Sequence, residues 1–143
     1  MIESLYNSYI KNPNCIHARR VHKIMIKNNT ILPYDKWLKE YTFELEPSFY
    51  LFATLGAGTL FPPNILNISD DNINEIYKCI TADDIYVKYL SRKRNIKIVW
   101  VPNKFPLGLE EMKDKTTQKD ALFKLNTKGG KFNDFYLNIY PII

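Results

Sequence analysis

The sequence predicts an α/β fold formed as one domain over residues 1–143, with an α+β arrangement left open. The 143 residues suffice for one hydrophobic core, and neither a linker nor an internal repeat divides them. Stretches with helical spacing of apolar residues alternate with short strand-like stretches. Only two or three of the strands are clear. We therefore expect a small mixed sheet with flanking helices.

The first half of the chain begins with a helix and continues in extended form. In residues 2–11, apolar side chains recur at helical spacing on one face, and Asn12-Pro13-Asn14 ends the helix. Residues 15–26 alternate apolar and polar side chains, which predicts a strand. A turn is expected at residues 27–30, followed by an irregular segment or a short helix around Trp37.

The second half contains most of the predicted helices. Residues 50–60 are expected to form an apolar strand or a short buried element, interrupted at the glycines. Residues 96–101 are the clearest strand. Ser69 can cap the helix that follows it, and either Thr81 or Asp83 can cap the next. The helices are predicted at residues 70–79, 83–94, 117–125 and 133–140.

Charge and cysteine content limit the classes of partner. The formal charge of +5 permits contact with phosphate groups or an anionic membrane face, but requires neither. Basic residues are densest at 88–97, where they also complement a helix dipole. No nucleic-acid-binding motif is present, so nucleic acid is not an expected partner. Cys15 and Cys79 lack metal-ligand spacing and are expected to be reduced. Neither an export signal nor a membrane span is visible, so we expect a cytoplasmic protein, with contact at the inner membrane face permitted.

Two segments of the second half share a pattern with a known enzyme family. Residues 55–63 read Leu-Gly-Ala-Gly-Thr-Leu-Phe-Pro-Pro, and residues 81–88 read Thr-Ala-Asp-Asp-Ile-Tyr-Val-Lys. They resemble the second half of family-2-like glycosyltransferases of the GT-A fold, bacterial enzymes that make surface polysaccharides. Phe61 stands where this family commonly has Tyr, and Tyr86 where it has Trp. The segments at residues 16–22 and 33–37 match the family in the same order.

The resemblance implies a partial GT-A-like fold. The N-terminal nucleotide-binding βαβ half of that fold, with its Asp-x-Asp metal motif, has no counterpart in the sequence. Asp70 and Asp71 lie at the start of a predicted helix. We interpret them as helix-start residues and not as a substitute for the Asp-x-Asp motif. We therefore expect no metal or cofactor in this chain. A nucleotide-sugar donor and a divalent cation are expected only for a full-length enzyme, and a missing N-terminal half or a second copy is an expected partner.

The resemblance also implies the site residues. Asp84 is the candidate general base, and Asp83 would orient the acceptor or hold the helix start. The simpler alternative is that both acids lie in the first turn because the helix dipole favours anions there. The candidate substrate-binding residues are Gly56, Ala57, Gly58, Trp37, His17 and Arg19. For these the alternatives are a backbone bend at the glycines, a core position for Trp37 and a solvated strand face for His17 and Arg19.

Two functions are consistent with these patterns. The first is a glycosyltransferase fragment that transfers a sugar, with inversion, from a nucleotide-sugar donor to a glycan or other hydroxyl acceptor in surface polysaccharide synthesis. The alternative is a non-catalytic remnant that binds carbohydrate or a protein partner. That alternative predicts an exposed apolar surface, which usually signals association.

Overall fold

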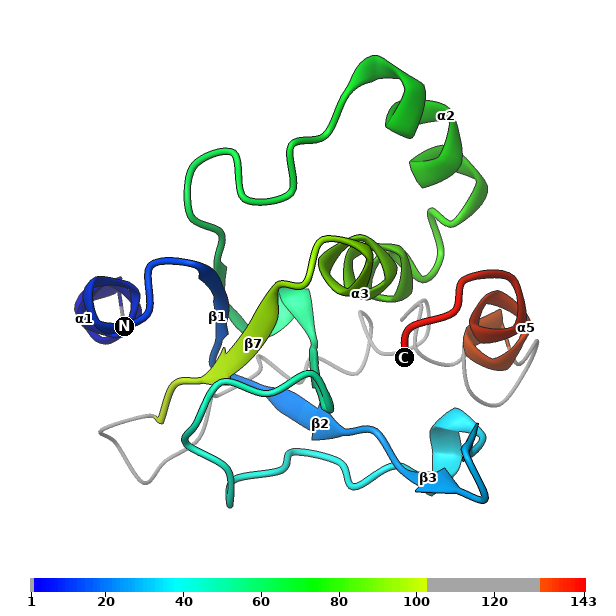
Figure 1. Ribbon diagram of the computed structural model, residues 1–143, viewed down its shortest axis with the longest axis horizontal. Coiled ribbons are helices and arrows are strands. Elements are labelled where there is room, and N and C mark those ends of the chain that lie inside the picture. Colours follow the sequence, from blue (N-terminus) through cyan, green and yellow to red (C-terminus); the bar gives the residue numbers. More distant parts are fainter. Residues whose placement is uncertain (1, 103–131) are drawn as a thin grey trace, which may run out of the picture.

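The computed structural model describes residues 2–102 and 132–143, apart from the side chains of residues 70–72. The described residues form a mixed α/β structure, which confirms the general class (Figure 1). None of the described helices has the length and apolar character needed to cross a bilayer. The helices are α1 (Ile2–Lys11), α2 (Asp70–Lys78), α3 (Asp83–Lys93) and α5 (Phe132–Ile139), with 3₁₀ turns η1 (Tyr34–Lys36) and η2 (Leu55–Ala57). The helix predicted at 117–125 lies outside the described residues.

The strands form three small sheets. The largest has the order β6-β1-β7, in which β1 runs parallel to β7 and antiparallel to β6. A second sheet pairs β2 with β5, and a third is the hairpin β3–β4. The strands are β1 (Cys15–Ala18), β2 (Val21–Lys23), β3 (Ile26–Lys27), β4 (Thr30–Ile31), β5 (Leu51–Ala53), β6 (Thr59–Leu60) and β7 (Lys97–Trp100).

The single strand expected at residues 15–26 is wrong, because a bend divides it. The Arg19 N–H still donates to the Gly58 carbonyl of the first sheet, at 3.1 Å. The Arg20 carbonyl already accepts from the Thr54 N–H of the second sheet, also at 3.1 Å. The bend at Arg19-Arg20 therefore carries the chain from one sheet to the other. The turn expected at residues 27–30 is present, with Asn28 and Asn29 at φ 51° and 59°, the left-handed region that two-residue hairpin loops require.

The helices pack on both sides of this small set of strands. Helix α1 lies against β1 and β6, α3 against β5, and α5 against α3 (Figure 1). Side chains from β1, β5, α3 and β7 meet in the core, and both cysteines are free, with Cys79 in the core. Fully buried core residues include Ile16, Ala18, Leu51, Phe52, Ile85 and Ile98.

Helix α1 has the predicted bounds but buries little of its apolar surface. Leu5 is buried against the sheet. Ile2, Tyr6 and Ile10, spaced four residues apart, are 78%, 53% and 60% exposed. Because residues four apart lie on one side of a helix, these three form an exposed apolar stripe, here called the α1 stripe.

Helix α3 begins differently from the sequence prediction. Ala82 is its N-cap residue and makes no side-chain cap, so Thr81 and Asp83 were wrong as N-caps. The exposed Asp83 carboxylate instead accepts the Asp84 N–H at 3.1 Å, which satisfies one donor of the first turn.

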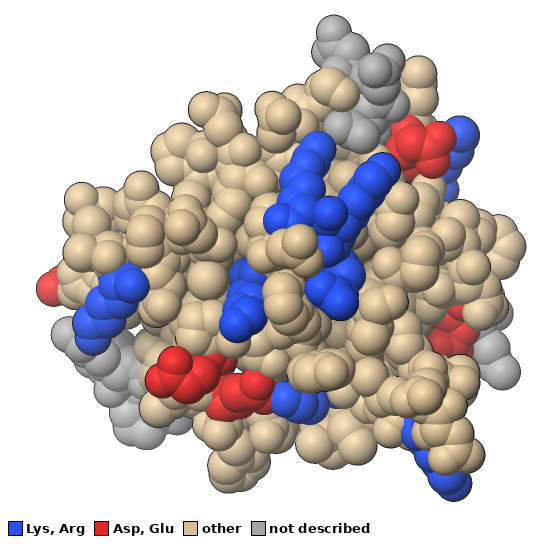
Figure 2. All heavy atoms as spheres, viewed as in Figure 1, with Lys and Arg blue, Asp and Glu red and all other residues tan. Residues whose placement is uncertain are grey.

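The basic stretch at residues 88–97 is only partly a solvated helix end. Lys88 is 1% exposed, and its Nζ donates to the Phe49 carbonyl at 2.6 Å. Arg92 and Lys97 lie over the Phe49 ring, 4.5 and 5.5 Å from its centroid. Figure 2 shows Lys and Arg side chains gathered where α3 ends and β7 begins.

We predict that Gly58→Ala and Gly56→Ala affect stability in opposite directions. Gly58 has φ 100°, which strains any residue with a Cβ, so we expect Gly58→Ala to lower the free energy of unfolding by about 1–3 kcal/mol. Gly56 has nothing within 4 Å of an added Cβ and no positive φ, so Gly56→Ala is expected to be neutral or to stabilise by about 0.4–1 kcal/mol. Urea unfolding of both variants checks this. If both variants lowered the free energy of unfolding equally, the different backbone conformations assigned to Gly56 and Gly58 would be contradicted.

Candidate functional site

The candidate base and the glycine segment are in direct contact. Asp84 lies in the first turn of α3, and its Oδ1 accepts a hydrogen bond from the Leu55 N–H at 3.1 Å. Leu55 is the first residue of η2, the turn that contains Gly56. Among the described residues, the other oxygen of this partly buried carboxylate accepts no hydrogen bond. One oxygen is therefore held by the backbone, and the second is free to accept a proton.

The surroundings of Asp84 favour its protonated form. Burial raises the pKa of Asp84 from its ordinary value of 3.8 to about 6, and the charge of Asp83 raises it further. The Leu55 N–H and the positive charge of Arg20 act in the opposite direction. A carboxylate with this pKa is ionised at neutral pH but binds a proton more readily than an exposed aspartate. These are the properties of a general base.

Arg20 and Tyr34 interact electrostatically with Asp84. Arg20 Nε donates to Thr54 Oγ1 at 2.7 Å, beside the start of η2. Burial raises the pKa of Tyr34 to about 12, and the negative charge of Asp84 adds to that shift. The Tyr34 phenol is therefore protonated at neutral pH and can donate a hydrogen bond. No local pattern of the sequence brings Arg20 near Asp84, whereas in the folded chain its charge acts on that carboxylate.

The three residues of the glycine segment differ in their surroundings. Gly56 is exposed, with open space beside its Cα. Ala57 is buried. Gly58 is partly buried and ends η2 with its left-handed φ of 100°. Gly56 is therefore the position at which a ligand can approach the backbone, while Gly58 serves the bend.

Trp37 and His17 lie within the protein rather than on a ligand surface. Trp37 is 3% exposed, packs against Tyr34 and Phe52, and donates its indole N–H to the Leu32 carbonyl at 2.8 Å. No face of its ring is open to a sugar, so the structure favours the core alternative for Trp37.

His17 has no exposed surface and joins β1 to the end of α1. Its Nδ1 lies 2.8 Å from the hydroxyl of Ser8, and its Nε2 lies 3.1 Å from the Asn12 carbonyl. Burial lowers the pKa of His17, so the imidazole is neutral at pH 7. We therefore assign His17 a structural role in place of substrate binding.

Arg19 follows β1 directly and is 8% exposed. Its carbonyl accepts a hydrogen bond from the Trp100 indole at 3.2 Å. Its buried Nε has no hydrogen-bond partner among the described residues. The hydrogen bonds of the Asp84 carboxylate and the charges that shift its pKa come from other residues, so the structure does not join Arg19 and Asp84 in one site.

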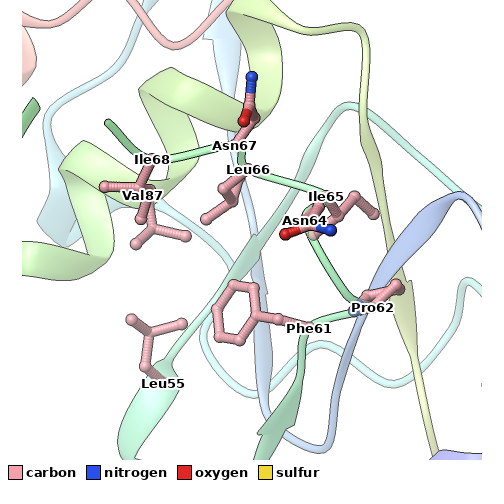
Figure 3. Close-up of a pocket in the computed structure, with 9 residues that line it drawn as sticks. All are labelled: Leu55, Phe61, Pro62, Asn64, Ile65, Leu66, Asn67, Ile68 and Val87. Carbon is pink, nitrogen blue, oxygen red and sulfur yellow. The ribbon is translucent and has the colours of Figure 1, made fainter. Parts of the chain in front are cut away.

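An apolar pocket of about 370 Å³ is lined in part by Leu55, the residue whose N–H binds Asp84. Figure 3 shows the side chains of Leu55, Phe61 and Val87 directed into it. Among the described residues of its lining, Asn64 and Asn67 are the polar ones. A second cavity of about 420 Å³, between the β3–β4 hairpin and α5, includes none of the predicted site residues.

We predict that Asp84→Asn stabilises the protein at neutral pH. Because the folded pKa of about 6 exceeds 3.8, the folded state keeps a proton that the unfolded chain loses between these values. Stability is therefore lost as pH rises through this window, and an uncharged Asn avoids that loss. The expected gain at pH 7 is about 1–3 kcal/mol, and it disappears near pH 4. Glu46→Gln is the control, because this acid is exposed and is not among the groups that shift the pKa of Asp84. Urea unfolding at both pH values measures the effect, and a gain that is the same at both would contradict it.

The described residues contain no group of three or more His, Cys, Asp or Glu side chains that could hold a metal ion. Comparison with protein-family models, with curated proteins and with solved structures finds no match to this chain. Two observations therefore bear on function: the geometry around Asp84, and the resemblance carried by residues 55–63 and 81–88.

Proposed function

We propose that this chain is the acceptor-side half of an inverting glycosyltransferase, with Asp84 as the general base. One observation carries the proposal. The Asp84 carboxylate is partly buried at a helix start, with one oxygen held by the Leu55 N–H and the other without a partner among the described residues. A base needs this combination of fixed orientation and a free oxygen.

The chemistry follows from that arrangement. An acceptor hydroxyl attacks the anomeric carbon of the donor sugar, and the bond from that carbon to the departing diphosphate breaks. The hydroxyl proton passes to the free oxygen of Asp84. Burial of the carboxylate raises its affinity for this proton, and the charge of Asp84 helps to keep the phenol of Tyr34 neutral.

The resemblance supports the rest of the proposal. It places the reaction in bacterial surface polysaccharide synthesis, with a nucleotide-sugar donor and a glycan acceptor, in the cytoplasm or at the inner membrane face. By the same resemblance, the divalent cation would be held by the nucleotide-binding half. Donor binding would depend on a nucleotide-binding half.

Asp84→Asn tests the proposal. With the chain co-expressed with a nucleotide-binding half, we expect this variant to lower kcat/KM for sugar transfer by about 10²–10⁴-fold, while Asp83→Asn has a smaller effect. The wild-type kcat/KM should rise with pH through about 6, because the base must be ionised to accept a proton. Unchanged turnover in Asp84→Asn would remove Asp84 from this role.

The α1 stripe supports a second candidate, a non-catalytic domain that binds a partner. Ile2, Tyr6 and Ile10 present three large apolar side chains to solvent on one side of α1. Apolar side chains grouped in this way favour association. The partner would be a nucleotide-binding half or a second copy of the chain.

Association through the α1 stripe can be measured by light scattering after size exclusion. We expect the wild type to form a dimer whose population grows with protein concentration, and the double variant Tyr6→Lys, Ile10→Lys to remain a monomer. Phe43→Lys is the control, because Phe43 is 86% exposed on a loop away from α1. A monomeric wild type, or a dimer that survives the double variant, would contradict self-association through this stripe.

A further inference from the structure

The apolar pocket and the candidate base share two structural elements. Leu55 donates its N–H to Asp84 and directs its side chain into the pocket (Figure 3). Val87 lines the pocket three residues after Asp84 on α3. Residues three apart are neighbours on a helix surface, so the wall of the pocket adjoins the helical turn that carries Asp84.

The residues that line the pocket disfavour the binding of a charged group. None of the described side chains that line it is charged, and Phe61, Leu66 and Val87 are among those that form its wall. A phosphate or carboxylate placed there would lose its hydration without gaining a counter-charge, which is strongly unfavourable. An uncharged apolar group would instead lose water from its surface, which is favourable.

The loop that forms one wall of the pocket is held by its own hydrogen bonds. Asn64 and Asn67 have φ 58° and 41°, a left-handed conformation that Asn tolerates better than most residues. The Asn67 N–H donates to the Asn64 carbonyl at 3.0 Å, and Arg94 Nη2 donates to the Asn67 carbonyl at 3.0 Å. A wall fixed in this way costs little ordering when a ligand binds.

We propose that this pocket binds an uncharged apolar group, alkyl or aryl, that the acceptor carries next to the hydroxyl that Asp84 deprotonates. The volume of about 370 Å³ lies within the range of small-molecule sites. The acceptor is therefore a neutral glycoside with an apolar substituent rather than a free or charged sugar. The role of the glycoside as acceptor rests on the proposed function. Binding of its apolar group to the pocket does not require catalysis.

Binding of two uncharged glycosides, measured by NMR titration of the full chain, tests this inference. We expect hexyl β-glucoside to bind about tenfold more tightly than methyl β-glucoside, because several methylene groups leave water. Phe61→Ala should remove most of that preference. Phe61 is 37% exposed, so the variant is expected to fold. Phe43→Ala removes a ring of the same size from an exposed loop that does not line the pocket, and it should keep the preference.

Equal affinity for the two glycosides would overturn the inference, as would an equal loss in Phe61→Ala and Phe43→Ala. A transfer assay with the same two glycosides, run on the chain co-expressed with a nucleotide-binding half, separates this result from the proposed function. If hexyl β-glucoside binds more tightly than methyl β-glucoside but no sugar is transferred, the assignment of the pocket is supported and the proposed catalysis is contradicted. Transfer without hexyl preference supports catalysis and overturns the assignment of the pocket.

Discussion

The hydrogen bond from the Leu55 N–H to the Asp84 carboxylate joins two segments that are 29 residues apart in the chain. It fixes the start of α3 against η2, and with it the orientation of the candidate base. The same contact aligns Leu55 with Val87, which form two walls of the apolar pocket. The base, the glycine turn and the pocket are therefore parts of one arrangement, and its position depends on this bond.

Helix α3 carries two ionisable groups that burial shifts toward their neutral forms. Burial raises the pKa of Asp84 to about 6 and lowers the pKa of Lys88 to about 7, four residues later. Lys88 holds the Phe49 carbonyl just before β5, so a structural contact accounts for its position. Asp84 accepts one backbone hydrogen bond, and its second oxygen accepts none from the part of the chain that the structure describes. A partly buried acid that lowers stability without completing a network is typical of a functional site.

The sequence predicted local features better than tertiary ones. Helix α1 was predicted with its observed bounds, because the apolar spacing and the Asn-Pro-Asn stop are local signals. The bend at Arg19-Arg20 was missed, since alternation continues through it while the hydrogen-bond partners change. The resemblance implied both Asp84 and the glycine segment as site residues, and the structure brings Asp84 against Leu55, next to Gly56. Its proximity to Arg20 and Tyr34 and the burial of Trp37 depend on contacts between distant segments, which no local pattern encodes.

The ionisation of Asp84 in the folded protein tests the central claim most directly. The carboxyl carbon of Asp84 can be followed by NMR as the pH changes, with Asp84→Asn to identify its signal. A midpoint near pH 6 is the expected result, because the carboxylate is partly buried beside η2. A midpoint near the ordinary value of 3.8 would mean that the carboxylate is solvated, and it would contradict Asp84 as a buried base.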